Sequence, residues 1–145
     1  SANTPRTTLA SDDPAVVSLG IMDDWDEADR AKVTERPATW TETAVPAANT
    51  AATATKASGG GSVQHYITSI SASISRAVAA ATDGPLLTLK DGATVKGNWY
   101  VNVDSPLVIT FAQPLQFTAA TAAELSLAAG GADVKGTVTM TGYSI

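Results

Sequence analysis

The sequence contains no cysteine, only one histidine and few aromatic residues, and each shortage excludes a kind of chemistry. Without cysteine there are no disulfides, no thiolate nucleophiles and no cysteine-ligated metal sites. Small secreted domains often depend on disulfides, so we expect this chain to fold in a reducing cytoplasm. We also see no leader peptide and no apolar run of membrane-spanning length, and therefore expect no membrane partner.

Basic residues are also scarce, and the formal net charge of −5 is unevenly distributed. Residues 1–44 contain nine acidic and four basic residues, whereas residues 45–145 contain five of each. A nucleic-acid-binding protein needs a basic stripe, so we expect no nucleic-acid partner. The asymmetry indicates an acidic N-terminal arm, residues 1–44, and a separate body, residues 45–145. The arm is extended and contains at most a short helix, beginning near Pro14.

In the body, polar and apolar residues alternate, which is typical of strands with one buried face. In "QHYITSISASISRAV" we place Tyr66, Ile70, Ala72 and Ile74 on one face, opposite a row of serines. Further strands are expected in "TAATATKA", "PLLTLKDG", "TVKGNWYVNV", "LVITF", "LQFT" and the two arms of "AELSLAAGGADVKGTVTMTGY". We expect "SGGGS" to form a flexible turn or a hairpin loop, and the pair Gly130-Gly131 to form the turn of a hairpin. About eight short strands predict an all-β antiparallel sandwich, with a jelly roll as the preferred topology.

Neighbouring aromatic residues in "TVKGNWYVNV" are expected to point to opposite faces of their strand. Trp99 shares its face with Val95 and Val101, so we expect these side chains in the core. Tyr100 shares the other face with asparagines, so we expect it to face solvent or contact a neighbouring subunit.

The single histidine, His65, is expected on the serine-bearing face, where it could act as a general base. A serine nucleophile also needs an orienting third group and an oxyanion pocket, and no nucleophile-elbow motif is present. The alternative, an ordinary surface histidine, is preferred. We therefore expect no catalytic residues, and we expect that the protein is not an enzyme.

The stretch "DDWDEADR" has the highest charge density of the chain and could indicate a calcium site. Counting from Asp24 places Asp26 and Glu35 at suitable positions of a calcium-binding loop. Ala28 and Asp29 then occupy positions that require an oxygen ligand and a glycine. Neither this register nor the one from the preceding residue fits, so we expect no metal ligands and no cofactor.

Two readings of the arm remain: a solvated charged stretch, or a docking segment. Tryptophan is favoured at interface hot spots, and surrounding charges steer association. The same apolar side chains could instead fold back on the chain's own body. The candidate partner-binding residues are Met22, Asp23, Asp24, Trp25, Asp26 and Trp40.

Several stretches resemble small virion proteins of tailed bacteriophages: "DDPAVVSLGIMDDWDEADRAKV", "VQHYITSISASISRA", "GPLLTLKDGATV" and "VITFAQPLQFTAATAAELSLAAGGADVKGTVTMTGY". The layout of the last three is similar to that of capsid decoration (cement) proteins. The resemblance implies a jelly-roll domain on the capsid exterior that binds the major capsid protein and braces its subunits. It also implies a dimer or trimer, assembled in the bacterial host cytoplasm, without catalytic residues. The alternative is a tail- or spike-associated β-sandwich module that binds host-surface carbohydrate.

Overall fold

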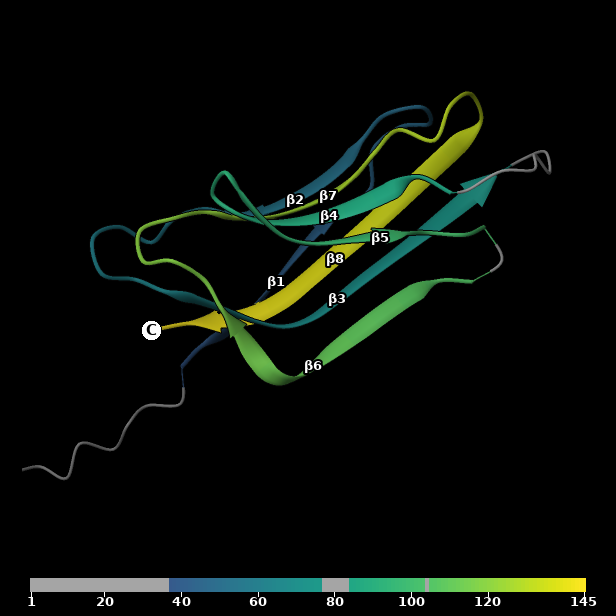
Figure 1. The fold of residues 1–145 in the computed structure, drawn as a ribbon. Coiled ribbons are helices and arrows are strands. Elements are labelled where there is room, and N and C mark those ends of the chain that lie inside the picture. The colour runs from purple at the N-terminus through teal and green to yellow at the C-terminus, as the bar shows by residue number, and fades with distance from the viewer. Residues whose placement is uncertain (1–36, 77–83, 104) are drawn as a thin grey trace, which may run out of the picture. The chain divides into compact units, whose positions relative to one another are not determined.

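The protein folds as a two-layered β-sandwich (Figure 1). A computed structural model describes residues 37–76, 84–103 and 105–145. Every strand pair is antiparallel, and the described residues contain no helix. This confirms the predicted fold class. The strands are β1 (Thr39–Ala44), β2 (Ala52–Lys56), β3 (His65–Arg76), β4 (Leu86–Asp91), β5 (Thr94–Tyr100), β6 (Leu107–Gln116), β7 (Ala123–Leu127) and β8 (Val134–Ser144).

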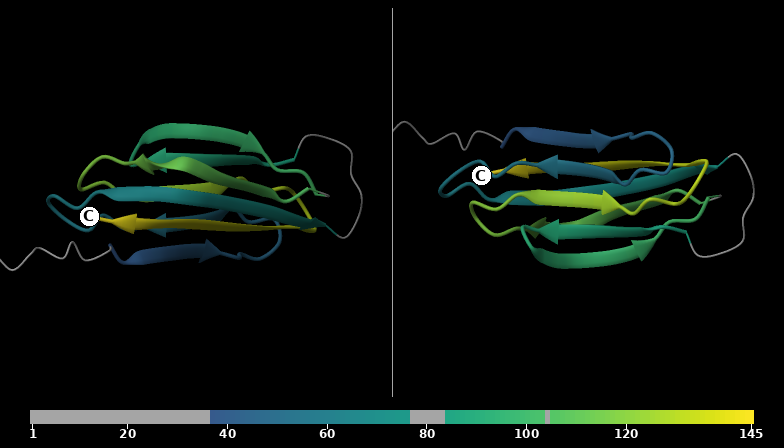
Figure 2. Two further views of the ribbon diagram at one scale, coloured as in Figure 1. Left: turned by 90° about the horizontal axis from the view of Figure 1, so that it is seen from below. Right: turned by 90° about the horizontal axis from the view of Figure 1, so that it is seen from above.

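The strand order is that of a jelly roll. The first sheet, sheet A, has the order β1-β8-β3-β6, and the second, sheet B, has the order β2-β7-β4-β5. The strands therefore pair first with last: β1 with β8, β2 with β7, β3 with β6 and β4 with β5. This is the pattern of one long antiparallel ribbon rolled into two Greek keys. Figure 2 looks onto the two faces of the sandwich, onto sheet A in the view from below and onto sheet B in the view from above, with the strands of each sheet side by side.

The hairpin expected at Gly130-Gly131 is wrong, and of the two alternatives for "SGGGS" the turn holds and the hairpin does not, because the strands on either side of each loop lie in different sheets. The "SGGGS" loop connects β2 of sheet B to β3 of sheet A, and the loop with Gly130-Gly131 connects β7 to β8. Alternation shows that a strand has one buried face, but it does not show in which sheet the strand pairs. Among the described strands, only β4 and β5 are both consecutive and paired, through the predicted Asp91-Gly92 turn.

The two short strands expected at "LVITF" and "LQFT" form one strand, β6, which contains Pro114. Proline lacks a backbone donor and is tolerated in an edge strand or a bulge. Both conditions hold here, because β6 is an edge of sheet A and its register against β3 shifts. Ile67 pairs with Leu115 and Ser69 pairs with Thr110, so four residues of β6 face one residue of β3.

A bulge at Thr68 reverses the inward and outward alternation of β3. Against β8, Ile67 pairs with Gly142 and Ser69 pairs with Thr141, which leaves Thr68 as an extra residue. Before the bulge the inward residues are His65 and Ile67, and after it they are the even-numbered residues from Ile70. The expected placements of Tyr66 with the core and of His65 with the serines are therefore both wrong.

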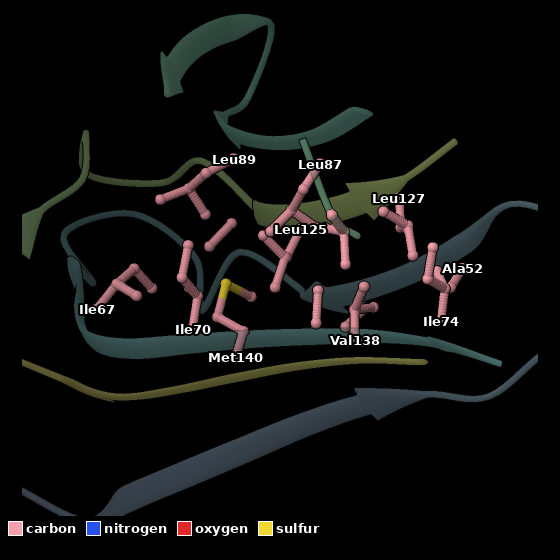
Figure 3. Packing of buried hydrophobic residues seen from close by; sticks show 14 of the residues in the cluster. Ala52, Ile67, Ile70, Ile74, Leu87, Leu89, Leu125, Leu127, Val138 and Met140 are labelled. Atoms are coloured by element: carbon pink, nitrogen blue, oxygen red, sulfur yellow. The ribbon is translucent and has the colours of Figure 1, made fainter. Parts of the chain in front are cut away.

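The core consists of aliphatic side chains that project inward from both sheets (Figure 3). Sheet A supplies Ile67, Ile70, Ile74, Val138 and Met140, and sheet B supplies Ala52, Leu87, Leu89, Leu125 and Leu127. Trp99 is half-buried and packs against this core, next to the fully buried Val101.

Val95 does not join the core and is 49% exposed. The register of β5 shifts between Val95, which pairs with Lys90, and Gly97, which pairs with Leu89. The extra residue between them turns Val95 to the outer face of sheet B. A bulge again changes the side that a correctly identified strand residue faces.

The compact unit of the described chain spans Pro37–Ile145 and includes β1. Residues 39–44, which the charge pattern grouped with the arm, therefore form an edge strand of sheet A. Residues 1–36 lie outside the described part of the chain.

Candidate functional site

The structure places two of the predicted contact residues, Trp40 on β1 and Tyr100 on β5. Met22, Asp23, Asp24, Trp25 and Asp26 lie outside the described residues, and their role in docking stays a prediction. Tyr100 is 64% exposed on the outer face of sheet B, which agrees with its expected direction. Its role as a subunit contact also stays a prediction.

Trp40 connects β1 to the rest of the sandwich. Its side chain points inward and packs against the core as a half-buried residue. The Nε1–H group donates a 2.9 Å hydrogen bond to Ser144 Oγ, and the ring meets His65 edge-on at 5.8 Å between centroids. Lys56 Nζ lies 5.3 Å from the centroid of the same ring. A partner could therefore reach only the part of Trp40 that these contacts leave exposed.

His65, Ser144 and Trp40 form a chain of hydrogen bonds. The indole N–H can only donate, so Ser144 Oγ accepts it, and Ser144 Oγ lies 2.8 Å from His65 Nδ1. The carbonyl oxygen of Ala57 can only accept, so His65 Nε2 carries a proton and donates it at 2.9 Å. The chain joins β1, β3, the end of β8 and the loop after β2.

The pair of Ser144 and His65 has the separation of a nucleophile and a general base. Two features make this geometry better suited to a structural link. The indole of Trp40 donates to Ser144 Oγ, and His65 is only 1% exposed. The bulge at Thr68 buries His65, and strict alternation in the sequence could not have indicated this.

A second buried polar residue, Asp91, anchors the loop between β6 and β7. Its carboxylate accepts hydrogen bonds from the backbone N–H of Thr118 at 2.9 Å, the Thr118 hydroxyl at 2.8 Å and the Thr121 hydroxyl at 2.5 Å. Lys96 Nζ lies 3.2 Å from the same carboxylate. Burial raises the pKa of Asp91, but these hydrogen bonds outweigh burial and hold the pKa below its ordinary value of 3.8.

Two tyrosines and two glutamines gather at one end of sheet A. Tyr66 and Tyr143 pair across β3 and β8, and their rings stack at 5.0 Å between centroids with an angle of 3°. Gln64 Oε1 accepts hydrogen bonds from the Tyr66 hydroxyl at 3.2 Å and from Gln116 Nε2 at 3.0 Å. We call these four residues the Tyr–Gln cluster. The sequence separates its members by up to 79 positions, so only the topology brings them together.

A shallow, open pocket adjoins the Tyr–Gln cluster. Amide, ammonium and hydroxyl groups line it, and the ring of Phe117 lies buried beneath them. Its lining residues are Gln64, Lys96, Gln116, Phe117, Thr118 and Ala119.

The outer face of sheet A carries rows of hydroxyl side chains, which we call the hydroxyl face. Its members are Thr41, Thr43, Ser69, Ser71, Ser73, Thr110, Thr137, Thr139 and Thr141. Across β1 and β8, the Thr43 and Thr139 hydroxyls lie 3.1 Å apart, and those of Thr41 and Thr141 lie 3.4 Å apart. Among the described outward-facing strand residues of this sheet there is no acid, and Lys135 at one end is the one base.

Within the described residues, no group of three histidine, cysteine, aspartate or glutamate side chains is placed to hold a metal ion. The same part of the chain contains no helix of the length and apolarity needed to cross a membrane. The acidic stretch in residues 23–30 lies outside this part.

No protein-family model matches the chain, and no curated protein is significantly similar to it.

Proposed function

We propose that this protein is a structural virion protein that binds the outside of a tailed-phage capsid and reinforces contacts between major capsid subunits. In this role it is a homo-oligomer, a dimer or trimer, that assembles in the bacterial host cytoplasm. It acts without a cofactor and catalyses no reaction.

The observation that carries the proposal is where the resembling stretches fall in the fold. "VQHYITSISASISRA" contains β3, "GPLLTLKDGATV" contains β4, and the long C-terminal stretch runs from β6 through β8. The stretches that resemble cement proteins are thus strands of a jelly roll, which is the fold that the resemblance implies.

The hydroxyl face further supports a role in protein packing. Burying an unpaired charge at an interface is strongly unfavourable, and the strands of this face present no acid and one base. Serine, threonine and tyrosine side chains also adapt their hydrogen bonds to a partner surface. A broad, nearly uncharged face of this kind can lie against a capsid without leaving ions desolvated.

The test is electron cryo-microscopy of virions made with and without this protein. We expect additional density on the capsid exterior in the first sample only, and earlier rupture of the second under heat or osmotic shock. Density confined to the tail, or shells of equal strength, would contradict the proposal.

A second candidate function, carbohydrate binding by a tail or spike module, is favoured by the Tyr–Gln cluster. Aromatic rings and side-chain amides beside an open pocket suit a neutral sugar. A glycan array probed with the full chain tests this function. The expected result is binding that Tyr143→Ala abolishes and Thr43→Ala leaves intact; an array without signal would contradict it.

A further inference from the structure

The sandwich is closed along one side and open along the other. β1 and β2 lie against each other, whereas no comparable contact joins β5 to β6, the strands at the opposite edges, among the described residues. On β6 the inward-facing Leu107, Ile109 and Phe111 are consequently only half-buried, although they pack against the core. An apolar row thus remains partly exposed along the free edge that Figure 1 shows for β6.

A comparison of the four edge strands singles out β6. Exposed edges invite pairing with another strand, and proteins prevent this with charges, prolines or bulges. β1 contains Glu42, β2 contains Lys56 and β5 contains Lys96, but β6 contains no charged residue. Pro114 and the adjacent bulge protect only the second half of β6, which leaves the segment Leu107–Thr110 and its neighbour Phe111 unprotected.

We propose that this segment of β6 pairs antiparallel with β6 of a second copy across a two-fold axis at Ile109. In this register Leu107 lies opposite the partner's Phe111, and Ile109 lies opposite its own counterpart, so apolar side chains meet on the inward side. On the outer side, Val108 lies opposite the partner's Thr110. A residue near a two-fold axis lies close to the same residue of the other copy, so a charged residue there would be repelled by its counterpart. This segment contains no charged residue.

The pairing joins the two copies of sheet A into one continuous sheet of eight strands. It satisfies free backbone groups of both edges and covers the half-buried row of β6. Val108, which is 69% exposed in the single chain, becomes a contact residue. The pairing rests on the proposed homo-oligomer and, of the dimer and the trimer proposed above, makes it a dimer.

The first experiment measures the molar mass of the full chain in solution by light scattering over a range of concentrations. We expect a dimer for the wild type and a monomer for Val108→Lys, because the two-fold axis brings the two new charges together on the outer face of the joined sheet, where they repel each other. The matched control is Val45→Lys, at a valine that is 57% exposed outside β6, and it should stay dimeric. A wild type that is monomeric or trimeric, or a Val108→Lys variant that stays dimeric, would overturn the inference.

The second experiment tests the register, using the absence of native cysteine. In a dimer of the doubly substituted chain Val108→Cys/Thr110→Cys, the thiol at position 108 of each copy faces the thiol at position 110 of the other copy. Paired positions of this kind have a separation that a disulfide can bridge. We expect most of this variant to form a covalent dimer under mild oxidation. Thr41→Cys/Thr43→Cys, at exposed positions of the other edge of sheet A, should stay monomeric on a non-reducing gel. Equal cross-linking of both variants would overturn the register.

These results are independent of whether the protein binds capsids. If the dimer forms as described but virions carry no density on the shell, the proposed function fails and the pairing stands. If shells are decorated by a protein that is monomeric in solution and is not cross-linked through β6, the pairing fails and the proposed function stands.

Discussion

Asp91 shows how a single buried carboxylate can hold several parts of a sandwich together. Its side chain is 1% exposed, yet it is ionised, because Thr118, Thr121 and Lys96 supply the partners that water would otherwise provide. Three of these interactions reach from the end of β4 to the loop after β6. The carboxylate therefore fixes the position of the loop that carries the shallow pocket.

Replacing Asp91 with asparagine should destabilise the fold at neutral pH by about 1–3 kcal/mol, because buried donors lose a charged acceptor. The folded-state pKa lies below the unfolded value, so the ionised form stabilises the fold above roughly pH 4. This contribution is lost as the pH falls through the folded-state pKa. Urea unfolding at pH 7 and pH 3 should show the difference between wild type and Asp91→Asn shrinking at the lower pH.

The control for this comparison is Glu124→Gln, which removes a half-exposed ion pair with Lys90. Pairs of this kind contribute only about 0–1 kcal/mol, so the control should unfold almost like the wild type. Equal losses for Asp91→Asn and Glu124→Gln would show that the buried hydrogen bonds add nothing beyond an ordinary surface charge.

Ser144 is the central member of the chain that runs from Trp40 to His65. Ser144→Ala should lower the free energy of unfolding by about 1–3 kcal/mol, because it leaves the buried Nδ1 and the indole N–H without partners. The indole resonance of Trp40 should shift in an NMR spectrum of the variant. Thr41→Ala, which removes one exposed hydroxyl contact, should cost less than about 0.5 kcal/mol. A Ser144→Ala variant as stable as Thr41→Ala would contradict the structural role.

At the scale of the elements, alternation in the sequence was enough to predict strands and a sandwich, but not which residues lie inside. The single extra residues at Thr68 in β3 and beside Val95 in β5 reverse the facing of the positions on one side of each bulge. A bulge depends on the partner strand, which lies far away in the sequence. For the same reason the sequence could not indicate the burial of His65 or the pairing of Tyr66 with Tyr143.

Gly142 allows β1 and β3 to pack on either side of β8. A Cβ atom at this position would collide with the carbonyl oxygen of Tyr66 and lie 2.8 Å from the ring of Trp40. Gly142→Ala should therefore destabilise the protein by about 1–3 kcal/mol in urea unfolding, the usual cost of overpacking. Gly61→Ala, where nothing lies within 4 Å, should change stability by less than about 0.5 kcal/mol. Similar losses of stability in both variants would mean that β1 and β3 move away from β8 without a cost in free energy, which would contradict the role of Gly142.

At the scale of the whole molecule, the charge separates the chain into two parts with different chemistry. Residues 1–36 contain eight acids and four bases, whereas residues 37–145 contain six acids and five bases. The described part has its own core and forms a compact unit. A role for that segment in docking predicts that its removal affects binding and not folding.

Deleting residues 1–36 is the sharpest test, because the cut leaves β1 and the contacts of Trp40 intact. We expect an unchanged melting temperature and at least about tenfold weaker binding to capsid shells, equivalent to about 1.4 kcal/mol. The remaining affinity should also depend less on salt, since exposed charges steer association only within a Debye length. Sedimentation with shells at low and high salt measures both effects. If the shortened chain binds as tightly as the full one, the acidic segment has no role in docking.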